Sequence, residues 1–471
     1  MTVAAGAPAA IGRPDAAAAA VDRGPVVAAL EDLGAFAAGV EWSEQPEAVR
    51  TAALRVLGDS VAVTIAGGRL AENRRIRGAL PASPGPATVF GEASGRGVVD
   101  AAWCNGTAMV SLELDEGNKA IRGHAAAHVL PAVLAVGEAQ RVPGQALAAA
   151  FLAGHEVASR LGRATVLRPG VHPHGNWGVA GAAAGAARLA GADARRMARA
   201  LDVAGALALA TPFSVATSGL SVRHAWIGAA NASGIRAAAL STLDEPVAGV
   251  AGDSLGCILG TLDPAALVDA LGTQWAVTGG YFKRHASCSY THPPADAALA
   301  VRSRRGPVTA GRVTAIEVAT HHLAASLDGM RWDTRLAAMF SVPYVVAVAL
   351  RHGDCAPERF DDAHRADADL RSLAGKVSVV LDPALDARLP AWRAARLRVG
   401  WADGSEDVVE MDNPVGDADH HPFSDGELLA KWSALLGQDR AAEVSDACSA
   451  LVGSADVSVE LGALRHLAAA P

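Results

Sequence analysis

The pattern of apolar residues changes near Gly279, and this change limits the folds that the 471-residue chain can adopt. From about residue 25 to residue 275, apolar side chains recur with helical spacing, and alanine, the residue with the highest helix propensity, is abundant. The clearest helical patterns cover residues 129–139, 145–161, 180–189 and 235–240. Aromatic residues make up only 4% of the chain, so Ala, Val and Leu must fill the core. The sequence therefore predicts a mainly α fold with closely packed helices.

Two helices have recognisable ends. Ser43 can cap a helix that passes through Glu47, and Gly67-Gly68 would end it. Near the C-terminus, Ser424 and Glu427 have the spacing of a capping box, in which each side chain satisfies a free backbone N–H of the other residue. A second helical region therefore follows the change in pattern.

Strand signals dominate between Gly279 and Asn413. β-Branched runs of strand length occupy residues 313–320 and 376–381, and the turn sequence at 402–405 is typical of a β-hairpin. A helix over 339–350 makes this region α+β. We predict a mobile N-terminal tail over residues 1–24 and the first part of a large helical domain over 25–278. An α+β lid domain is inserted over 279–413, and the helical domain resumes over 414–471.

Charge and cysteine content argue against several classes of protein. The formal net charge is −8 and no block of Lys or Arg occurs, so nothing supports nucleic-acid binding. The uncharged run at 203–222 contains Pro212 and is interpreted as a buried helix and a loop, not as a membrane span. Five scattered cysteines without a Cys-x-x-Cys pair indicate neither an iron–sulfur cluster nor a zinc site. Together with the lack of a leader pattern, they predict a cytoplasmic protein.

Residues 281–292 form the first candidate site segment. The chain has four lysines against 37 arginines and only three tyrosines, yet this segment contains Lys283 and two tyrosines beside Cys288 and His292. Unlike arginine, a buried lysine changes its pKa readily. A lysine among histidines and tyrosines therefore indicates proton chemistry or anion binding, although four lysines must fall somewhere.

A second candidate segment combines carboxylates with histidines. Glu113, Asp115 and Glu116 lie within four residues, and His124 and His128 follow at helical spacing. Two histidines and a carboxylate could bind a metal ion, but no established metal motif supports this interpretation. The alternative is a polar loop that caps a helix.

Three further motifs were weighed. His172 lies in the Gly- and Pro-rich loop 170–178, ahead of an Ala-rich helix. Arg223 precedes a helix predicted to begin near Gly228, where a cation is unfavourable unless an anion also binds. Residues 252–256 match the Gly-x-Ser-x-Gly elbow of α/β-hydrolases, but the elbow requires alternating strands and helices, which this region does not predict.

Taken in order, these segments resemble the MmgE/PrpD family, which includes 2-methylcitrate dehydratase, cis-aconitate decarboxylase and iminodisuccinate epimerase. The resemblance runs from about residue 25 to residue 460. It rests on 59–68, 113–117 with His124, 154–157 with Arg160, 170–178, Arg223 with 228–230, Lys283 with Cys288 and His292, and 340–344. It implies a homodimer in which each subunit binds a small carboxylate between a helical domain and a lid, without a metal or other cofactor.

The resemblance also implies roles for individual residues. The catalytic residues would be His172, Lys283, Tyr344 and His124, and the substrate would be bound by Glu113, Asp115, Arg223 and His292. In this hypothesis Lys283 and Arg223 hold carboxylates, and His172 moves the proton at carbon. Tyr344 or His124 would assist a leaving hydroxyl or bind the enediolate that forms next to a carboxylate. Lys283→Ala is then expected to abolish turnover without changing the melting curve.

Two departures from the family pattern affect the expected reaction. Glu113-Leu-Asp-Glu-Gly117 stands where the family usually has Asp-Phe-Asp-Asp-Thr, so a hydroxyl is lost, and Arg223 stands where Lys is frequent. A dehydratase is the first hypothesis, followed by a decarboxylase or an epimerase of a related acid in a specialised pathway. A non-catalytic carboxylate-binding protein and a metal-dependent hydrolase using Asp115, His124 and His128 are the alternatives from other classes.

Overall fold

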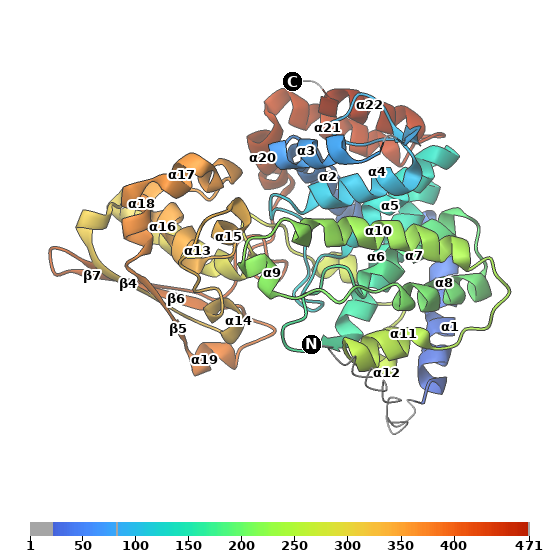
Figure 1. Cartoon of the computed structure of the whole chain (residues 1–471), viewed down its shortest axis with the longest axis horizontal. Coiled ribbons are helices and arrows are strands. Elements are labelled where there is room, and N and C mark those ends of the chain that lie inside the picture. Colours follow the sequence, from blue (N-terminus) through green and yellow to red (C-terminus); the bar gives the residue numbers. More distant parts are fainter. Residues whose placement is uncertain (1–21, 82, 470–471) are drawn as a thin grey trace, which may run out of the picture.

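The computed structural model describes residues 22–81 and 83–469. Most of the predicted tail, residues 1–21, lies outside this part, and the first helix begins at Gly24. Long helices fill one end of the molecule, and a smaller region with a sheet forms the other end (Figure 1). The prediction of a mainly helical fold with a small mixed sheet in the C-terminal part is therefore confirmed.

The helical part is built from two groups of helices that lie far apart in the sequence. The first group consists of α1 (Gly24–Gly39), α2 (Glu47–Gly68), α3 (Ala71–Ala79), α4 (Val98–Met109), α5 (Ala125–Gln140), α6 (Gly144–Ala164), α7 (Gly178–Leu189), α8 (Ala194–Ala206) and α10 (Val222–Leu240). The second group consists of α20 (Asp425–Leu436), α21 (Gln438–Leu451) and α22 (Ser458–Ala469).

Close helix packing explains the scarcity of aromatic residues. Where α6 and α7 cross, a Cβ atom on Gly154 would lie 2.6 Å from the carbonyl oxygen of Gly181, and a Cβ on Gly181 would lie 2.7 Å from that of Gly154. The two backbones can approach this closely only because both residues lack a side chain. Alanine fills most of the remaining contact surface of α7.

A buried ion pair joins the second group of helices to the first. Figure 1 shows α20 and α21 beside α2. Lys431 of α20 donates to Asp59 of α2 at 2.8 Å and to the carbonyl oxygen of Leu114 at 2.9 Å, and the Trp432 indole donates to Asp59 at 3.0 Å. The capping box of Ser424 with Glu427 is confirmed.

The sheet has the strand order β5-β4-β6-β7. Strand β4 (Val313–Thr320) pairs in parallel with β5 (Val377–Leu381) and antiparallel with β6 (Ala395–Trp401), and β6 pairs antiparallel with β7 (Glu406–Met411) through the predicted hairpin. Helices α13 (His292–Arg305) and α16 (Val342–His352) pack against it. A second, small sheet of β2 (Thr165–Leu167) and β3 (Gly260–Leu262) was not predicted.

Three local expectations differ from the structure or are settled by it. Ser43 does not cap α2: it lies in the 3₁₀ turn Trp42–Glu44, and α2 begins after Pro46. Residues 252–256 lie in α11 (Val250–Asp253) and the π-helical turn that follows, which does not form a nucleophile elbow. In the described part of the chain, every helix is too short or too polar to cross a membrane.

Candidate active site

A cavity of about 490 Å³ lies where the helical part meets the part that carries the sheet. Residues after the change in pattern contribute to its wall at positions 281, 288–290, 322–323, 326, 340 and 393. Among the described lining residues there are four arginines, Arg122, Arg168, Arg223 and Arg393, but a single carboxylate, Glu113. A wall with this excess of positive charge favours an anionic ligand.

The loop between α4 and α5 places two carboxylates against two cations. Glu113 adopts a left-handed backbone conformation with φ 51°, and its carboxylate binds Arg223 and lies 3.4 Å from Lys283 Nζ. The same Nζ donates to Asp115 at 3.1 Å. All four side chains are buried. The cations that the resemblance assigned to substrate carboxylates are therefore already paired with carboxylates of the protein.

These pairings fix the protonation states of the buried charges. Burial opposes ionisation of Asp115, but the neighbouring His124 and Lys283 hold the pKa of this carboxyl well below its usual value. Burial likewise opposes the charge of Lys283, but Asp115 and Glu113 raise its pKa above that of an ordinary lysine. Lys283 therefore remains an ammonium ion at neutral pH and acts as a fixed positive charge.

Arg223 lies in the first turn of α10, because this helix begins at Val222 and not near Gly228 as predicted. A cation at this end opposes the helix dipole and requires a neighbouring anion. Glu113 supplies that anion from within the chain. The Arg223 guanidinium also lies 5.3 Å from the centre of the Phe340 ring, and it lines the cavity.

His124 and Asp115 form a paired base. The Nδ1 atom of His124 lies 2.7 Å from the carbonyl oxygen of Glu116 and 3.0 Å from Asp115 Oδ2. Because a carbonyl oxygen can only accept, Nδ1 carries the proton and Nε2 of the neutral ring is free to accept one. His124 lines the cavity. Among the described histidines of the cavity wall, only His124 is paired with a buried carboxylate, and its Nε2 is the free base.

His172 has the opposite tautomer. Its Nδ1 accepts a hydrogen bond from the backbone N–H of His174 at 3.1 Å, so Nε2 carries the proton of the neutral ring. The ring stacks on Phe213 with a centroid distance of 5.3 Å. Burial, and then the charge of Arg223, holds the pKa of His172 well below its usual value. His172 is therefore a neutral hydrogen-bond donor at the cavity wall.

His128 is not available as a metal ligand. Its Nδ1 is 2.8 Å from the carbonyl oxygen of His124, and its Nε2 accepts from the backbone N–H of Gly175 at 3.1 Å. Among residues 22–81 and 83–469, no group of three or more His, Cys, Asp or Glu side chains is arranged to hold a metal ion. The alternative of a site built from Asp115, His124 and His128 therefore loses its second histidine.

Because two buried histidines have lowered pKa values, the free energy of unfolding should depend on pH. Burial lowers the pKa of His128 to about 4, and the pKa of His174 lies well below its usual value for the same reason. The unfolded chain binds these protons near pH 6.5, so the unfolded state gains stability as the pH falls from there towards 4. We expect the free energy of unfolding to fall by up to about 1.4 kcal/mol per pH unit for each such histidine. Urea denaturation between about pH 7 and pH 5 tests this, and His128→Gln should show a shallower slope; an unchanged slope would contradict the assignment.

Gly117 leaves room for the Tyr281 phenol. Their backbones pair through two hydrogen bonds, of 3.1 and 2.7 Å, which join the carboxylate loop to the start of the lid segment. A Cβ atom on Gly117 would lie 2.5 Å from the Tyr281 hydroxyl oxygen. The Tyr281 hydroxyl therefore occupies space that a side chain at position 117 would need.

Gly117→Thr is expected to destabilise the protein. The new side chain would overlap the Tyr281 ring, and overpacking of this kind costs about 1–3 kcal/mol. Urea denaturation measures the loss. Gly311→Thr is the matched control, because a Cβ atom on Gly311 would meet nothing within 4 Å. Equal stability of both variants would show that the contact with Tyr281 is unimportant.

The structure does not bring Tyr344 or His292 to the cavity wall. The Tyr344 hydroxyl donates to the carbonyl oxygen of Arg359 at 2.9 Å, and its ring packs on Trp332 and Phe360. His292 Nε2 lies 3.2 Å from the carbonyl oxygen of Ser287. Neither residue lines the cavity, so the roles that the resemblance implied for them are not carried into the proposal below. Lys283 and Asp115 do not line it either, but they contact Glu113 and His124, which do.

Sequence reasoning missed several residues of the cavity wall. Arg393 is buried between the rings of Tyr281 and Tyr290, with the guanidinium carbon 5.3 Å from each ring centre. The two tyrosines belong to the segment that was singled out. Arg393 carried no signal, because it is one of 37 arginines and stands just before an ordinary strand.

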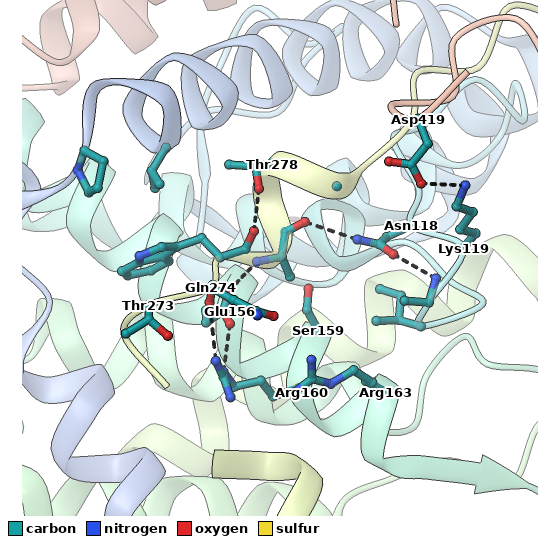
Figure 2. Close-up of a pocket in the computed structure, with 17 residues that line it drawn as sticks. Asn118, Lys119, Glu156, Ser159, Arg160, Arg163, Thr273, Gln274, Thr278 and Asp419 are labelled. Carbon is teal, nitrogen blue, oxygen red and sulfur yellow. Dashed lines mark hydrogen bonds and ion pairs between the residues drawn. The ribbon is translucent and has the colours of Figure 1, made fainter. Parts of the chain in front are cut away.

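A second cavity, of about 640 Å³, is lined in part by residues 118–121 (Figure 2). Ile121 lines both cavities. The charged side chains of the second cavity are satisfied by one another and by the backbone: Arg160 binds Glu156 at 2.7 Å and the carbonyl oxygen of Asp269 at 2.8 Å. Asn118 donates to the carbonyl oxygen of Ala276 at 3.1 Å. These contacts hold the loop that leads to His124.

The fold and the cavity define a class of protein with an arginine-rich cavity between a helical part and a part with a small sheet. Residues 31–247 match the MmgE/PrpD N-terminal domain and residues 285–450 match the MmgE/PrpD C-terminal domain, so the chain belongs to the MmgE/PrpD family. Members of this family are generally lyases that act on carboxylates. Comparison with curated proteins gave no match.

Proposed function

We propose that this protein is a lyase that acts, without a cofactor, on a di- or tricarboxylic acid of the 2-methylcitrate type, with dehydration as its favoured reaction. The observation that carries the proposal is the Asp115–His124 pair, which faces a cavity of net positive charge that also presents the His172 donor. Such a site combines a base with stabilisation of a negatively charged intermediate.

The tautomers assign the proton-transfer roles. His124 Nε2 takes the proton from the carbon next to a substrate carboxylate, and Asp115 stabilises the imidazolium ion that forms. His172 donates its Nε2–H to the enediolate or to the leaving hydroxyl without losing its proton. The proposal thus exchanges the roles that the resemblance implied for these two histidines.

The elimination balances with one base. The C–H bond breaks, its proton moves to His124, and the enediolate accepts a hydrogen bond from His172 in the positive field of the wall arginines. The C–O bond then breaks, and the proton on His124 passes to the departing oxygen. The products are an alkene and water, and His124 is neutral again. Loss of carbon dioxide would instead break a C–C bond and leave a carbanion, which takes up a proton that His124 has first bound from solvent.

One experiment separates these outcomes. The protein is incubated in deuterated water with citrate, 2-methylcitrate, cis-aconitate and malate, and the mixtures are followed by NMR. We expect deuterium at a carbon next to a carboxylate, together with loss or addition of water. Release of carbon dioxide would assign a decarboxylase, and exchange with inversion alone an epimerase. Binding without exchange for every acid would favour a non-catalytic carboxylate-binding protein.

A further inference from the structure

We propose that Arg393 is the receptor for a second substrate carboxylate, remote from the carbon that loses the proton. This inference rests on the proposed function, because it names the part of the molecule that recognises the acid. It restricts the substrate to acids with at least two carboxylates.

The argument begins with the charge balance of the wall. Arg223 and Lys283 are paired with Glu113 and Asp115, so the inner cations carry little unbalanced charge. Arg393 forms no ion pair with any described carboxylate and is only 4% exposed. Burial opposes the charge of Arg393, but Tyr281, which also hydrogen-bonds its side chain, and Tyr290 and Asp417 raise its pKa, so a fixed cation without an ion-pair partner lines the cavity and can receive a carboxylate.

The direct contacts of Arg393 leave donors unused. Its Nη1 donates to Ser289 Oγ at 3.3 Å, and the rings of Tyr281 and Tyr290 flank the guanidinium. A guanidinium has five N–H donors in a planar fork that fits a carboxylate. Asp417 is near enough to act on the charge of Arg393, but it forms its own ion pair with Lys119 at 3.1 Å.

The backbone around Arg393 is held in place before any ligand arrives. Its N–H donates to Asn413 Oδ1 at 2.8 Å, and Asn413 Nδ2 donates to the carbonyl oxygen of Ala391 at 3.2 Å. Lys119 donates to the same carbonyl oxygen at 3.1 Å, and Figure 2 shows this lysine beside Asp419, its second carboxylate partner. A preorganised receptor loses little conformational entropy when it binds.

The other residues of the cavity wall indicate what the rest of the ligand is like. Trp177, Phe213 and Phe340 give the cavity an apolar surface between its polar groups. Arg122 and Arg168 are exposed and can draw anions towards the cavity. The class of ligand that fits is a polycarboxylic acid whose carboxylates are joined by a short hydrocarbon skeleton.

Equilibrium binding tests the inference without turnover. The probe is tricarballylate, a tricarboxylate with no hydroxyl to lose, titrated calorimetrically into the wild type, Arg393→Gln and Arg393→Lys. We expect Arg393→Gln to weaken binding by about 10- to 100-fold, and Arg393→Lys, which keeps the charge but loses the fork, to fall between the two. Arg398→Gln is the matched control, because Arg398 lies on β6, is half-exposed and pairs with Glu406. It should bind like the wild type.

Stability measurements separate a receptor from a structural arginine. Replacement of Arg393 by Gln removes its contacts with Ser289, Tyr281 and Tyr290 and should lower the melting temperature slightly, whereas added tricarballylate should raise the melting temperature of the wild type and not that of Arg393→Gln. Unchanged affinity in Arg393→Gln would overturn the inference and leave the proposed function intact. A wild type that does not bind tricarballylate would also overturn it. Absence of deuterium exchange with every acid would count against the proposed function instead.

Discussion

His124→Asn is expected to lower the turnover of the reacting acid by a factor of about 10²–10⁴, the usual contribution of a positioned general base. Asparagine cannot take up the proton from carbon, whereas Asp115 keeps its ion pair with Lys283. The rates of deuterium incorporation and of product formation should fall together, because both require proton removal. NMR in deuterated water measures both rates in one sample.

Two other histidine variants serve as comparisons for His124→Asn. His466→Asn changes an exposed histidine on α22 and should leave both rates unchanged. His172→Asn should slow product formation more than deuterium incorporation, because His172 is proposed to act on the intermediate and the leaving group. If His124→Asn kept more than about a tenth of the wild-type exchange rate, His124 would not be the base.

Lys283→Met is expected to abolish turnover and also to lower the free energy of unfolding by about 3–5 kcal/mol. The ammonium group is the shared partner of two buried carboxylates, Glu113 and Asp115. Arg223 still balances Glu113 after its loss, so Asp115 is the carboxylate that loses its permanent counter-charge. This revises the expectation from sequence, in which Lys283→Ala spared the melting curve. The sequence could not show that the partners of Lys283 are carboxylates of the protein.

Urea denaturation of a double variant tests the cause. Lys283→Met combined with Asp115→Asn removes the stranded charge, so it should be more stable than Lys283→Met alone. Lys376→Met is the matched control: Lys376 binds two backbone carbonyl oxygens and no carboxylate, and its loss should cost about 1 kcal/mol. If the double variant were the less stable one, the ion-pair explanation would be wrong.

Patterns that depend on neighbours in sequence were predictable. The residues 313–320 form β4 within the predicted limits, because a β-branched run between turns has few alternatives. The Ser424 capping box likewise depends on two residues three positions apart. By contrast, Ser43 does not cap α2, because Pro46 occupies the N-cap position. Proline has no backbone N–H, so it leaves no free donor at the start of a helix.

Site residues were predictable by segment but not by orientation. The loop with Glu113 and the segment with Lys283 do meet, as their unusual composition indicated. Tyr344 lies on α16, and nothing in the sequence distinguishes the face of a buried helix that meets a cavity from the face that meets Arg359. The tautomers of His124 and His172 depend on distant backbone atoms, and the sequence carries no trace of these contacts.

The reach of Lys431 back to Asp59 and to the carbonyl oxygen of Leu114 has a consequence for biosynthesis. A ribosome adds Lys431 only after the first group of helices and the sheet have been made, whereas N-terminal regions generally fold first. Until α20 emerges, the carboxylate loop lacks one of its anchors and Asp59 lacks its counter-ion. A nascent chain that stops before α20 therefore contains the carboxylate loop, His124 and Lys283 but lacks the ion pair that anchors this loop.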